Sequence, residues 1–342
     1  MNATTIGLDI AKNIFQVHGV DRCGKAVLRK QLKRAQVLAF FANLPACLIG
    51  IEACAGAHYW ARELTKLGHE VRLISPQFVK PYVKGNKNDA NDAEAICEAV
   101  GRPNMRFVPV KSVEQQDILA LHRVREGRVK ERTAQANRLR GLLGEYGIVI
   151  GQGLNQVRQR LPEILEDGEN GLSASARRLF ADLHQQILQL DQQVSDYEIT
   201  LQALYRASAQ CKKLGQIPGI GPLTATAAVA MLGDGKAFEK ARQVPAWLGI
   251  VPRQDSSGGK QKLLGISKRG DTYLRTLLIH GARAVVKAAA KKDDAQSRWI
   301  NELVQRRNAN IAAVAVANKN ARTIWAILTR NEAYRVPKAK AA

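Results

Sequence analysis

Residues 5–11 read TIGLDIA, a short apolar run that one acidic residue, Asp9, interrupts. Alternate side chains of a β-strand point to opposite faces of the sheet, so Ile6, Leu8 and Ile10 share one face. Asp9 then lies on the other face. An ionised carboxylate inside a sheet costs on the order of several kcal/mol unless it is paired or binds a metal. This stretch therefore predicts a strand whose carboxylate is either paired or bound to a metal.

Short strands and helices alternate through the rest of the N-terminal region. A turn-forming segment at residues 21–24 separates the second and third apolar runs, which indicates an antiparallel meander. We predict strands at residues 4–10, 15–20, 27–31, 47–51 and 71–75, and helices at residues 34–43, 59–67 and 89–100. Three hairpin-linked strands followed by alternating helices and strands is the order expected of a ribonuclease-H-like α/β fold.

Length and composition exclude several classes of protein. The 342 residues favour two or three domains, and 46% apolar with 24% charged residues is ordinary globular composition rather than that of a disordered or fibrous chain. No apolar run is long enough for a membrane span and no secretory signal is visible, which predicts a cytoplasmic protein. The five cysteines and six histidines lack the spacing of a disulfide framework or a zinc site.

The net charge of +22, from 52 Lys and Arg against 30 Asp and Glu, predicts a polyanionic partner, above all nucleic acid. The excess is uneven, with 15 basic and 9 acidic residues in 1–110, 13 of each in 111–210, and 24 against 8 in 211–342. We therefore predict an α/β domain at 1–110, a helical linker at 111–210, a mostly helical nucleic-acid-binding domain at 211–335 and a basic tail at 336–342.

The middle region has the pattern of a coiled coil. Apolar residues with alternating spacings of four and three form a seam at Leu183, Ile187, Leu190, Val194, Tyr197, Leu201 and Leu204. A second long helix is predicted at about 113–146, as the partner of 173–206 either in an antiparallel hairpin or in another subunit. We expect the glycines from 141 to 153 and Pro162 to break the chain between the two helices. The seam favours a homo-oligomer, a dimer or a tetramer.

Three further carboxylates complement Asp9. Glu52 ends the apolar run LIGIE at 48–52, and Asp89 and Asp92 stand three residues apart at the start of a predicted helix, so they project from one face. Each has an ordinary alternative, because a lone Asp can pair with an Arg and an Asp pair at a helix start can act as N-cap and first-turn charges. Together they are what a two-metal phosphoryl-transfer site needs, with hard oxygen ligands for Mg²⁺ on rigid elements.

Two glycine-containing segments mark the basic C-terminal region. Residues 218–221, PGIG, lie between apolar helical stretches, as in a helix-hairpin-helix turn whose backbone amides approach a phosphate; an ordinary tight turn is the alternative. Residues 252–260, PRQDSSGGK, place two adjacent hydroxyls on a glycine-rich loop followed by cations. Such a loop is able to present a nucleophilic oxygen to a phosphodiester, although a solvated loop is the commoner use of this composition.

The sequence resembles the DEDD transposases of bacterial insertion sequences, the IS110 family, which includes Piv-type DNA invertases. Six motifs in the family's order extend over nearly the whole chain. They are GLDIAK at 7–12, IGIEA at 49–53, KNDANDAEAI at 87–96, IPGIGPLTA at 217–225, GIVPRQDSSGGK at 249–260 and SKRGDTYLR at 267–275. The resemblance implies a RuvC-like ribonuclease-H fold, a coiled-coil linker used in oligomerisation and a helical transposase domain.

The resemblance also implies roles for particular residues. The family's four acidic residues map onto Asp9, Glu52, Asp89 and Asp92, which would bind two Mg²⁺ ions, with Mn²⁺ as a substitute. Its serine nucleophile maps onto Ser257, with Ser256 as the nearest rival. A structured bridge RNA is implied as a guide for recombination at the element's ends and its target DNA. We expect nucleic-acid contacts from Gly219, Gly221, Arg253, Lys260, Lys262, Lys268, Arg269 and Arg275.

The hypothesis is a Mg²⁺-dependent site-specific DNA recombinase. A Holliday-junction resolvase-like nuclease is the alternative that needs the acidic site but gives no role to the serine loop, so trapping a covalent adduct separates the two. A non-enzymatic nucleic-acid-binding protein leaves Asp9 and Glu52 unexplained. A sugar kinase or actin-like ATPase also opens with a strand Asp near phosphate, but no second glycine-rich phosphate loop follows.

Overall fold

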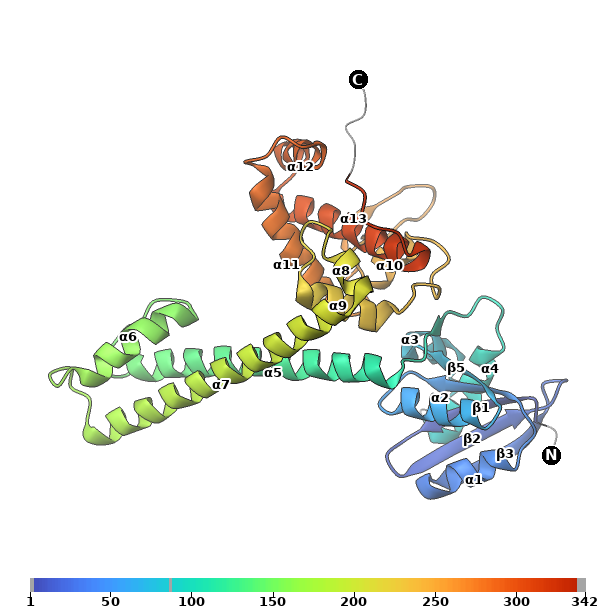
Figure 1. Ribbon diagram of the computed structural model, residues 1–342. Helices are drawn as coiled ribbons and strands as arrows, with labels where there is room; N and C mark the ends of the chain where they lie inside the picture. Colours follow the sequence, from blue (N-terminus) through green and yellow to red (C-terminus); the bar gives the residue numbers. More distant parts are fainter. Residues whose placement is uncertain (1–2, 86–87, 337–342) are drawn as a thin grey trace. The chain divides into compact units, whose positions relative to one another are not determined.

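The first part of the chain is built on one six-stranded sheet (Figure 1). The computed structural model describes residues 3–85 and 88–336, and the chain divides into two compact units, Met1–Val113 and Glu114–Ala342. Residues 337–342 of the predicted basic tail lie outside the described residues. The strands are β1 (Thr5–Ile10), β2 (Ile14–Val20), β3 (Ala26–Lys33), β4 (Leu48–Glu52), β5 (Glu70–Ile74) and β6 (Phe107–Val108).

The order of strands in the sheet is β3-β2-β1-β4-β5-β6. The first three form the predicted antiparallel meander, β4 and β5 continue the sheet in parallel from β1, and β6 closes it antiparallel to β5. The predicted mixed α/β architecture of this unit is confirmed. Sequence analysis missed β6, because two residues are too few for a pattern of alternation.

Helices cover both faces of the sheet in the first unit. The helical segments are η1 (Arg34–Gln36), α1 (Val37–Ala42), α2 (Ala57–Lys66), α3 (Pro76–Val79), η2 (Lys80–Tyr82) and α4 (Asp89–Val100). Residues of α1 and α2 share one buried core with Ile6 and Leu8 of β1. Helix α4 packs on the opposite face, where Ile96 and Val100 are buried with Ile74 of β5. The alternation of β1 therefore puts Asp9 on the face of α4.

Gly7 explains how closely α4 approaches the sheet. A β-carbon at this position would collide with the backbone carbonyl of Ala93 and the backbone of Cys97, both on α4. A glycine in the middle of a strand lets a second backbone come close. Because α4 lies against β1 in this way, its first turn is held near the end of β1 that carries Asp9.

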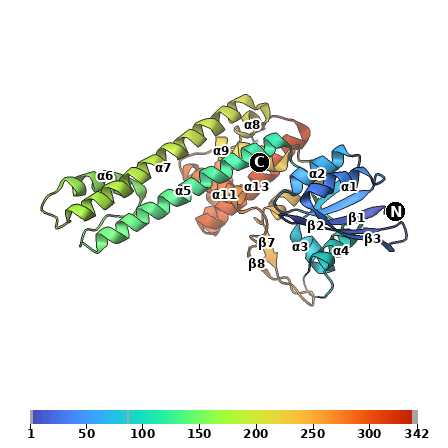
Figure 2. The same ribbon diagram turned by 90° about the horizontal axis from the view of Figure 1, so that it is seen from below.

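The second unit begins with a long pair of helices (Figure 2). Its helices are α5 (Val113–Gly144), α6 (Leu154–Glu166), α7 (Ala174–Ala207), α8 (Ala209–Leu214), α9 (Pro222–Leu232), α10 (Gln243–Trp247), α11 (Thr272–Ala289), α12 (Ala295–Arg306) and α13 (Ala309–Arg330). Helices α5 and α7 run antiparallel, since Arg132 on α5 contacts Asp191 at 2.7 Å and Gln135 bonds to Gln186 at 2.6 Å. Asp191 also accepts from Arg158 of α6 at 2.6 Å.

Helix α6 departs from the sequence-based expectation. The stretch between the long helices was expected to be a chain break, yet residues 154–166 are helical with Pro162 inside the helix. Proline removes an amide donor and its ring crowds the preceding turn. Burial of Val157, Leu161 and Ile164 in one core with α5 and α7 outweighs this cost.

The remaining helices, α8 to α13, enclose a core that is separate from that of the long pair. Two short strands, β7 (Pro252–Gln254) and β8 (Leu263–Ile266), form an antiparallel hairpin between α10 and α11. The serine segment, predicted as a glycine-rich loop, is the tip of this hairpin. Within the described residues, no helix is both long enough and apolar enough to cross a lipid bilayer.

Candidate active site and nucleic-acid interface

Three of the four predicted acidic residues come together in the first unit. Asp9 lies near the end of β1, and Asp89 and Asp92 occupy the first turn of α4. One carboxylate oxygen of each lies within 4.8 Å of those of the other two. Asn88 caps this helix, accepting a hydrogen bond from the amide of Asn91 at 2.8 Å, so the Asp pair does not serve as the cap.

Glu52, the fourth acidic residue, stands at the end of β4, the strand next to β1. Leu8 pairs with Ile51 in the parallel register, which puts Glu52 beside the segment that carries Asp9. Glu52 lies outside the group of three converging carboxylates, yet its charge acts on Asp9. The four residues therefore share one edge of the sheet, with three of them close enough to hold a common cation.

The raised pKa of Asp9 shows that ionisation is unfavourable in this group of carboxylates. Burial raises the pKa of Asp9 to about 6, from an ordinary value of 3.8, and the charges of Asp89, Asp92 and Glu52 add to the rise. The backbone amide of Ile10 opposes it. Like charges brought together disfavour ionisation, whereas a divalent cation among them would reverse the balance. The donor set, all carboxylate oxygens, fits a hard cation such as Mg²⁺.

The predicted serine nucleophile lies at the tip of the β7–β8 hairpin. Ser257 and Lys260 bracket a tight turn, with the Lys260 amide donating to the Ser257 carbonyl at 3.0 Å. Gly258 and Gly259 have φ of +53° and +76°, the left-handed pair that a type I′ turn requires and that glycine adopts without strain. The glycines of this segment therefore build a defined turn that leaves Ser257 exposed.

The two adjacent serines differ in their hydrogen bonds. The Ser256 hydroxyl oxygen accepts from the Gln254 side chain at 3.0 Å and from the Lys262 amide at 3.1 Å. The Ser257 hydroxyl has no hydrogen-bond partner within residues 3–85 and 88–336. Ser256 thus ties the two strands of the hairpin together, while Ser257 is open to an external partner.

Most of the predicted nucleic-acid contacts are exposed cations around this hairpin. The exposed set comprises Arg253, Lys260, Lys262, Lys268 and Arg269. Arg275 is different, since it is buried and its guanidinium donates to the Leu248 carbonyl and to the Thr272 hydroxyl, each at 3.0 Å. Its donors are used inside the unit, so Arg275 holds α11 to the end of α10 rather than presenting its charge to solvent.

The glycine turn at 218–221 joins α8 to α9. Gly219 has φ of +86°, and a β-carbon there would meet the backbone of Gly281 on α11, so packing alone requires glycine at this position. Gly221 is the N-cap of α9 and has open space around it. The helix start next to Gly221 is therefore the part of the turn that is sterically free for a ligand.

Sequence analysis missed a buried polar network in the second unit. His122 of α5 bonds to the Tyr273 hydroxyl at 2.9 Å and to the Thr226 hydroxyl at 3.0 Å, linking α5 to α11 and α9. Burial lowers the pKa of His122 to about 4, so the imidazole is neutral at pH 7. His122 is 104 positions from Thr226 and 151 from Tyr273, so no local motif signals the network.

Comparisons with known proteins agree on one family. A profile described as "Transposase", of the DEDD IS110 type, matches residues 6–148, and one described as "Transposase IS116/IS110/IS902 family" matches residues 211–298. A "Probable family 20 transposase" of Pseudomonas aeruginosa is 55% identical over 98% of this chain and 99% of its own length. This chain belongs to the IS110 family of transposases.

Other relatives place the transposase within this family. The "Transposase for insertion sequence element IS1111A" of Coxiella burnetii is 48% identical over 96% of this chain and 91% of its own length. A "Pilin gene-inverting protein" of Moraxella lacunata is 27% identical over 81% of each chain. The transposase is thus a DNA-processing enzyme, as the resemblance in its motifs predicted.

Proposed function

We propose that this transposase breaks and rejoins DNA strands using divalent ions held by Asp9, Glu52, Asp89 and Asp92 and a covalent bond to Ser257. The observation that carries the proposal is the convergence of three carboxylates within 4.8 Å, at a site that raises the pKa of Asp9 to about 6. Such a group is unfavourable by itself and becomes favourable around a cation.

The acidic residues have a binding role in this proposal. When bound, Mg²⁺ supplies positive charge to a phosphodiester and lowers the pKa of a coordinated hydroxyl, and Mn²⁺ is able to take its place. Asp9 lies on a strand, and Asp89 and Asp92 lie on a helix packed against that strand. Rigid elements of this kind keep the ligand atoms in place before a substrate arrives.

Ser257 has the chemical role. Its Oγ attacks the phosphorus of the DNA backbone, so an Oγ–P bond forms as the bond between phosphorus and one sugar oxygen breaks. The serine hydroxyl gives its proton to solvent, and the departing sugar oxygen takes up a proton. Rejoining is the same exchange with a different sugar hydroxyl as attacker. Each step replaces one phosphoester bond with another, so the number of these bonds is unchanged and no nucleotide cofactor is needed as an energy source.

The hydrogen bonds of the hairpin favour Ser257 over Ser256. The oxygen of Ser256 already accepts two hydrogen bonds, whereas the hydroxyl of Ser257 is exposed at the turn. The test is to trap protein on labelled DNA that carries the element's end. We expect Ser257→Ala to lose the covalent adduct and keep DNA binding, and Ser256→Ala to retain an adduct. An adduct that persists in Ser257→Ala contradicts the assignment and leaves the resolvase-like reaction.

The basic surface around the hairpin is proposed to hold the nucleic acid. Arg253, Lys260, Lys262, Lys268 and Arg269 are exposed, so each is able to contact a phosphate. Each phosphate neutralised on duplex DNA adds about 0.9 to the slope of log affinity against log salt. We expect a slope of several units for the full chain. A slope near zero contradicts this footprint.

The glycine turn and Arg275 have different parts in the proposed interface. We assign the phosphate contact at the turn to the helix start after Gly221 and a packing role to Gly219, which the backbone of Gly281 encloses. Arg275 is proposed to orient the base of the hairpin through the Leu248 carbonyl.

A structured bridge RNA as guide, and assembly as a dimer or tetramer, complete the proposal. The RNA rests on the family and on the basic C-terminal region. Assembly is supported by apolar side chains left exposed on α7, among them Ile199 at 64% and Leu179 at 49%. Copurified RNA that maps beside the gene, and a light-scattering mass above one subunit, are the expected results. A nucleic-acid-free monomer contradicts both.

A further inference from the structure

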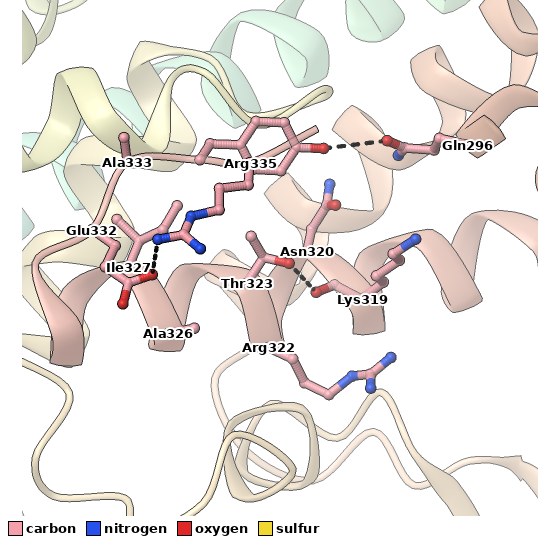
Figure 3. Close-up of a pocket in the computed structure, with 11 residues that line it drawn as sticks. Gln296, Lys319, Asn320, Arg322, Thr323, Ala326, Ile327, Glu332, Ala333 and Arg335 are labelled. Carbon is pink, nitrogen blue, oxygen red and sulfur yellow. Dashed lines mark hydrogen bonds and ion pairs between the residues drawn. The ribbon is translucent and has the colours of Figure 1, made fainter. Parts of the chain in front are cut away.

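A basic pocket lies in the second unit between α12, α13 and the segment that follows α13 (Figure 3). It encloses about 380 Å³, which is within the range of small-ligand pockets, about 300–1,000 Å³. Lys319, Arg322 and Arg335 supply three positive charges to its lining, against one negative charge from Glu332. The pocket plays no part in the site proposed above.

Two of these cations have no counter-ion among residues 3–85 and 88–336. Lys319 and Arg322 are one turn apart on α13, so their side chains are neighbours, and neither has a carboxylate within 4.0 Å among the described residues. Arg335, by contrast, pairs with Glu332 at 3.6 Å. Lys319 is partly buried, with its Nζ 4.9 Å from the ring centroid of Trp299. A partly buried ammonium without an anion is unfavourable, and an anion in the pocket would offset that cost.

A neutral donor faces the same space. Gln296 is 8% exposed, and its Oε1 accepts from the Tyr334 hydroxyl at 3.4 Å. Its Nε2 has no partner within the residues that the structure describes, and Figure 3 shows the amide end of Gln296 turned toward the other lining residues. The Gln296 amide therefore offers N–H groups to an oxyanion ligand in the pocket whose lining also includes Lys319 and Arg322.

One residue connects the pocket to the glycine turn. Asn320, which lines the pocket and is 3% exposed, donates from its side chain to the Pro218 carbonyl at 2.9 Å. The pocket wall is therefore bonded directly to the segment that carries Gly219 and Gly221. This continuity favours a nucleic-acid phosphate over a free metabolite as the anion.

We propose that the pocket binds a phosphodiester group of the nucleic acid on which the transposase acts, with Lys319 and Arg322 providing the charge and Gln296 a hydrogen bond. The inference rests on the proposed function, because it adds a phosphate contact to the proposed nucleic-acid interface. DNA and RNA share this chemistry, so the source of the phosphate is left to the probes of the experiment.

The test compares the full chain with a double variant, Lys319→Gln with Arg322→Gln, in binding fluorescent oligonucleotides of mixed sequence across a salt series. The probes are duplex DNA, single-stranded DNA and single-stranded RNA. Losing one phosphate contact lowers the slope of log affinity against log salt by about 0.9 on a duplex and about 0.7 on a single strand. At 0.1 M salt this corresponds to a loss of about fivefold to eightfold in affinity. The probe that shows the loss identifies the polymer.

Two control variants distinguish the loss of the cations in the pocket from the loss of positive charge elsewhere on the protein. Arg330→Gln removes one positive charge from an exposed position on the same helix outside the pocket, and Lys319→Arg keeps the charge in place. We expect both to bind with the slope of the unmodified chain. Unchanged affinity and slope in the double variant, or an equal loss in Arg330→Gln, overturns the pocket proposal. Absence of salt-dependent binding by the unmodified chain to every probe would instead refute the proposed function.

A second measurement uses the unmodified chain, so its result does not depend on whether a variant folds. Acetylation with an amine-reactive reagent, read by mass spectrometry, reports whether bound oligonucleotide shields Lys319. We expect shielding of Lys319 and continued modification of Lys292, an exposed lysine outside the pocket. Equal modification of Lys319 with and without saturating oligonucleotide overturns the proposal.

Discussion

Replacing Asp9 by Asn should stabilise the metal-free protein at neutral pH. Burial raises the folded-state pKa of Asp9 to about 6 from 3.8, and the neighbouring carboxylates add to the rise. A raised acidic pKa contributes stability that is fully present below pH 3.8 and is lost as the pH rises through about 6. The shift corresponds to about 3 kcal/mol, which solvent screening of this partly exposed group reduces to about 1–2 kcal/mol. Asn is neutral at every pH and avoids the loss.

Bound metal should make the unmodified chain more stable than Asp9→Asn. A ligand that binds only the folded state stabilises it by about 2.7 kcal/mol at a hundred times its dissociation constant. We expect Mg²⁺ to stabilise the unmodified chain and to leave Asp9→Asn nearly unchanged. The variant is then the more stable protein without metal at pH 7.5 and the less stable one with saturating metal.

Hydrogen exchange of peptides from the β1–β2 hairpin measures this effect in the first unit alone, after correction for the intrinsic pH dependence of exchange. The control is Glu70→Gln, which neutralises an exposed carboxylate on β5 of the same sheet. We expect little change in protection for the control. If Asp9→Asn at pH 7.5 without metal is protected no better than the unmodified chain, the ionised Asp9 carboxylate does not destabilise the folded first unit.

Three further predictions concern other parts of the molecule. Ser257→Ala should abolish the covalent DNA adduct in a denaturing gel while Ser256→Ala retains it, because the Ser256 oxygen already accepts two hydrogen bonds within the hairpin; adducts in both variants would count against the assignment. Gly7→Ala should destabilise the first unit by about 1–3 kcal/mol, since its new methyl group meets the α4 backbone, whereas Gly101→Ala has room and should melt normally. The pKa of Asp191 is lowered because, although burial raises it, hydrogen bonds from two arginines outweigh that effect. The stability that this ionised group contributes is present at pH 7 and is lost as the pH falls through the lowered pKa. Asp191→Asn should therefore destabilise the α5–α7 pair by about 1–3 kcal/mol at pH 7, measured by urea unfolding. An equally stable variant would be contrary evidence.

The sequence predicts the sheet of the first unit well, for a physical reason. Strands such as β1 and β4 are short apolar runs with one interrupting carboxylate, and each carries its own alternation or burial pattern. Carboxylates at the carboxyl ends of adjacent parallel strands, such as β1 and β4, share one edge of the sheet. The proximity of Asp9 to Asp89 and Asp92 additionally needs α4 to lie close to β1, which the clearance at Gly7 allows.

Features that depend on distant partners were not predictable in the same way. The strands β7 and β8 have three and four residues, too few to show a period, and pair only because the glycine turn closes them. Helix α6 contains Pro162, a residue that ordinarily ends a helix, and is held by burial against other helices. Nothing in the local sequence distinguishes Arg275 from a surface arginine, because its carbonyl partner, Leu248, lies 27 residues away along the chain.

The proposed reaction requires the acidic residues at the edge of the sheet to bind divalent ions. Anomalous diffraction from crystals soaked in Mn²⁺ measures this binding, because the signal identifies the element and locates it. We expect a peak among the carboxylates of Asp9, Asp89 and Asp92, absent from crystals of Asp9→Asn. Saturating Mn²⁺ with no peak at these three side chains would contradict it.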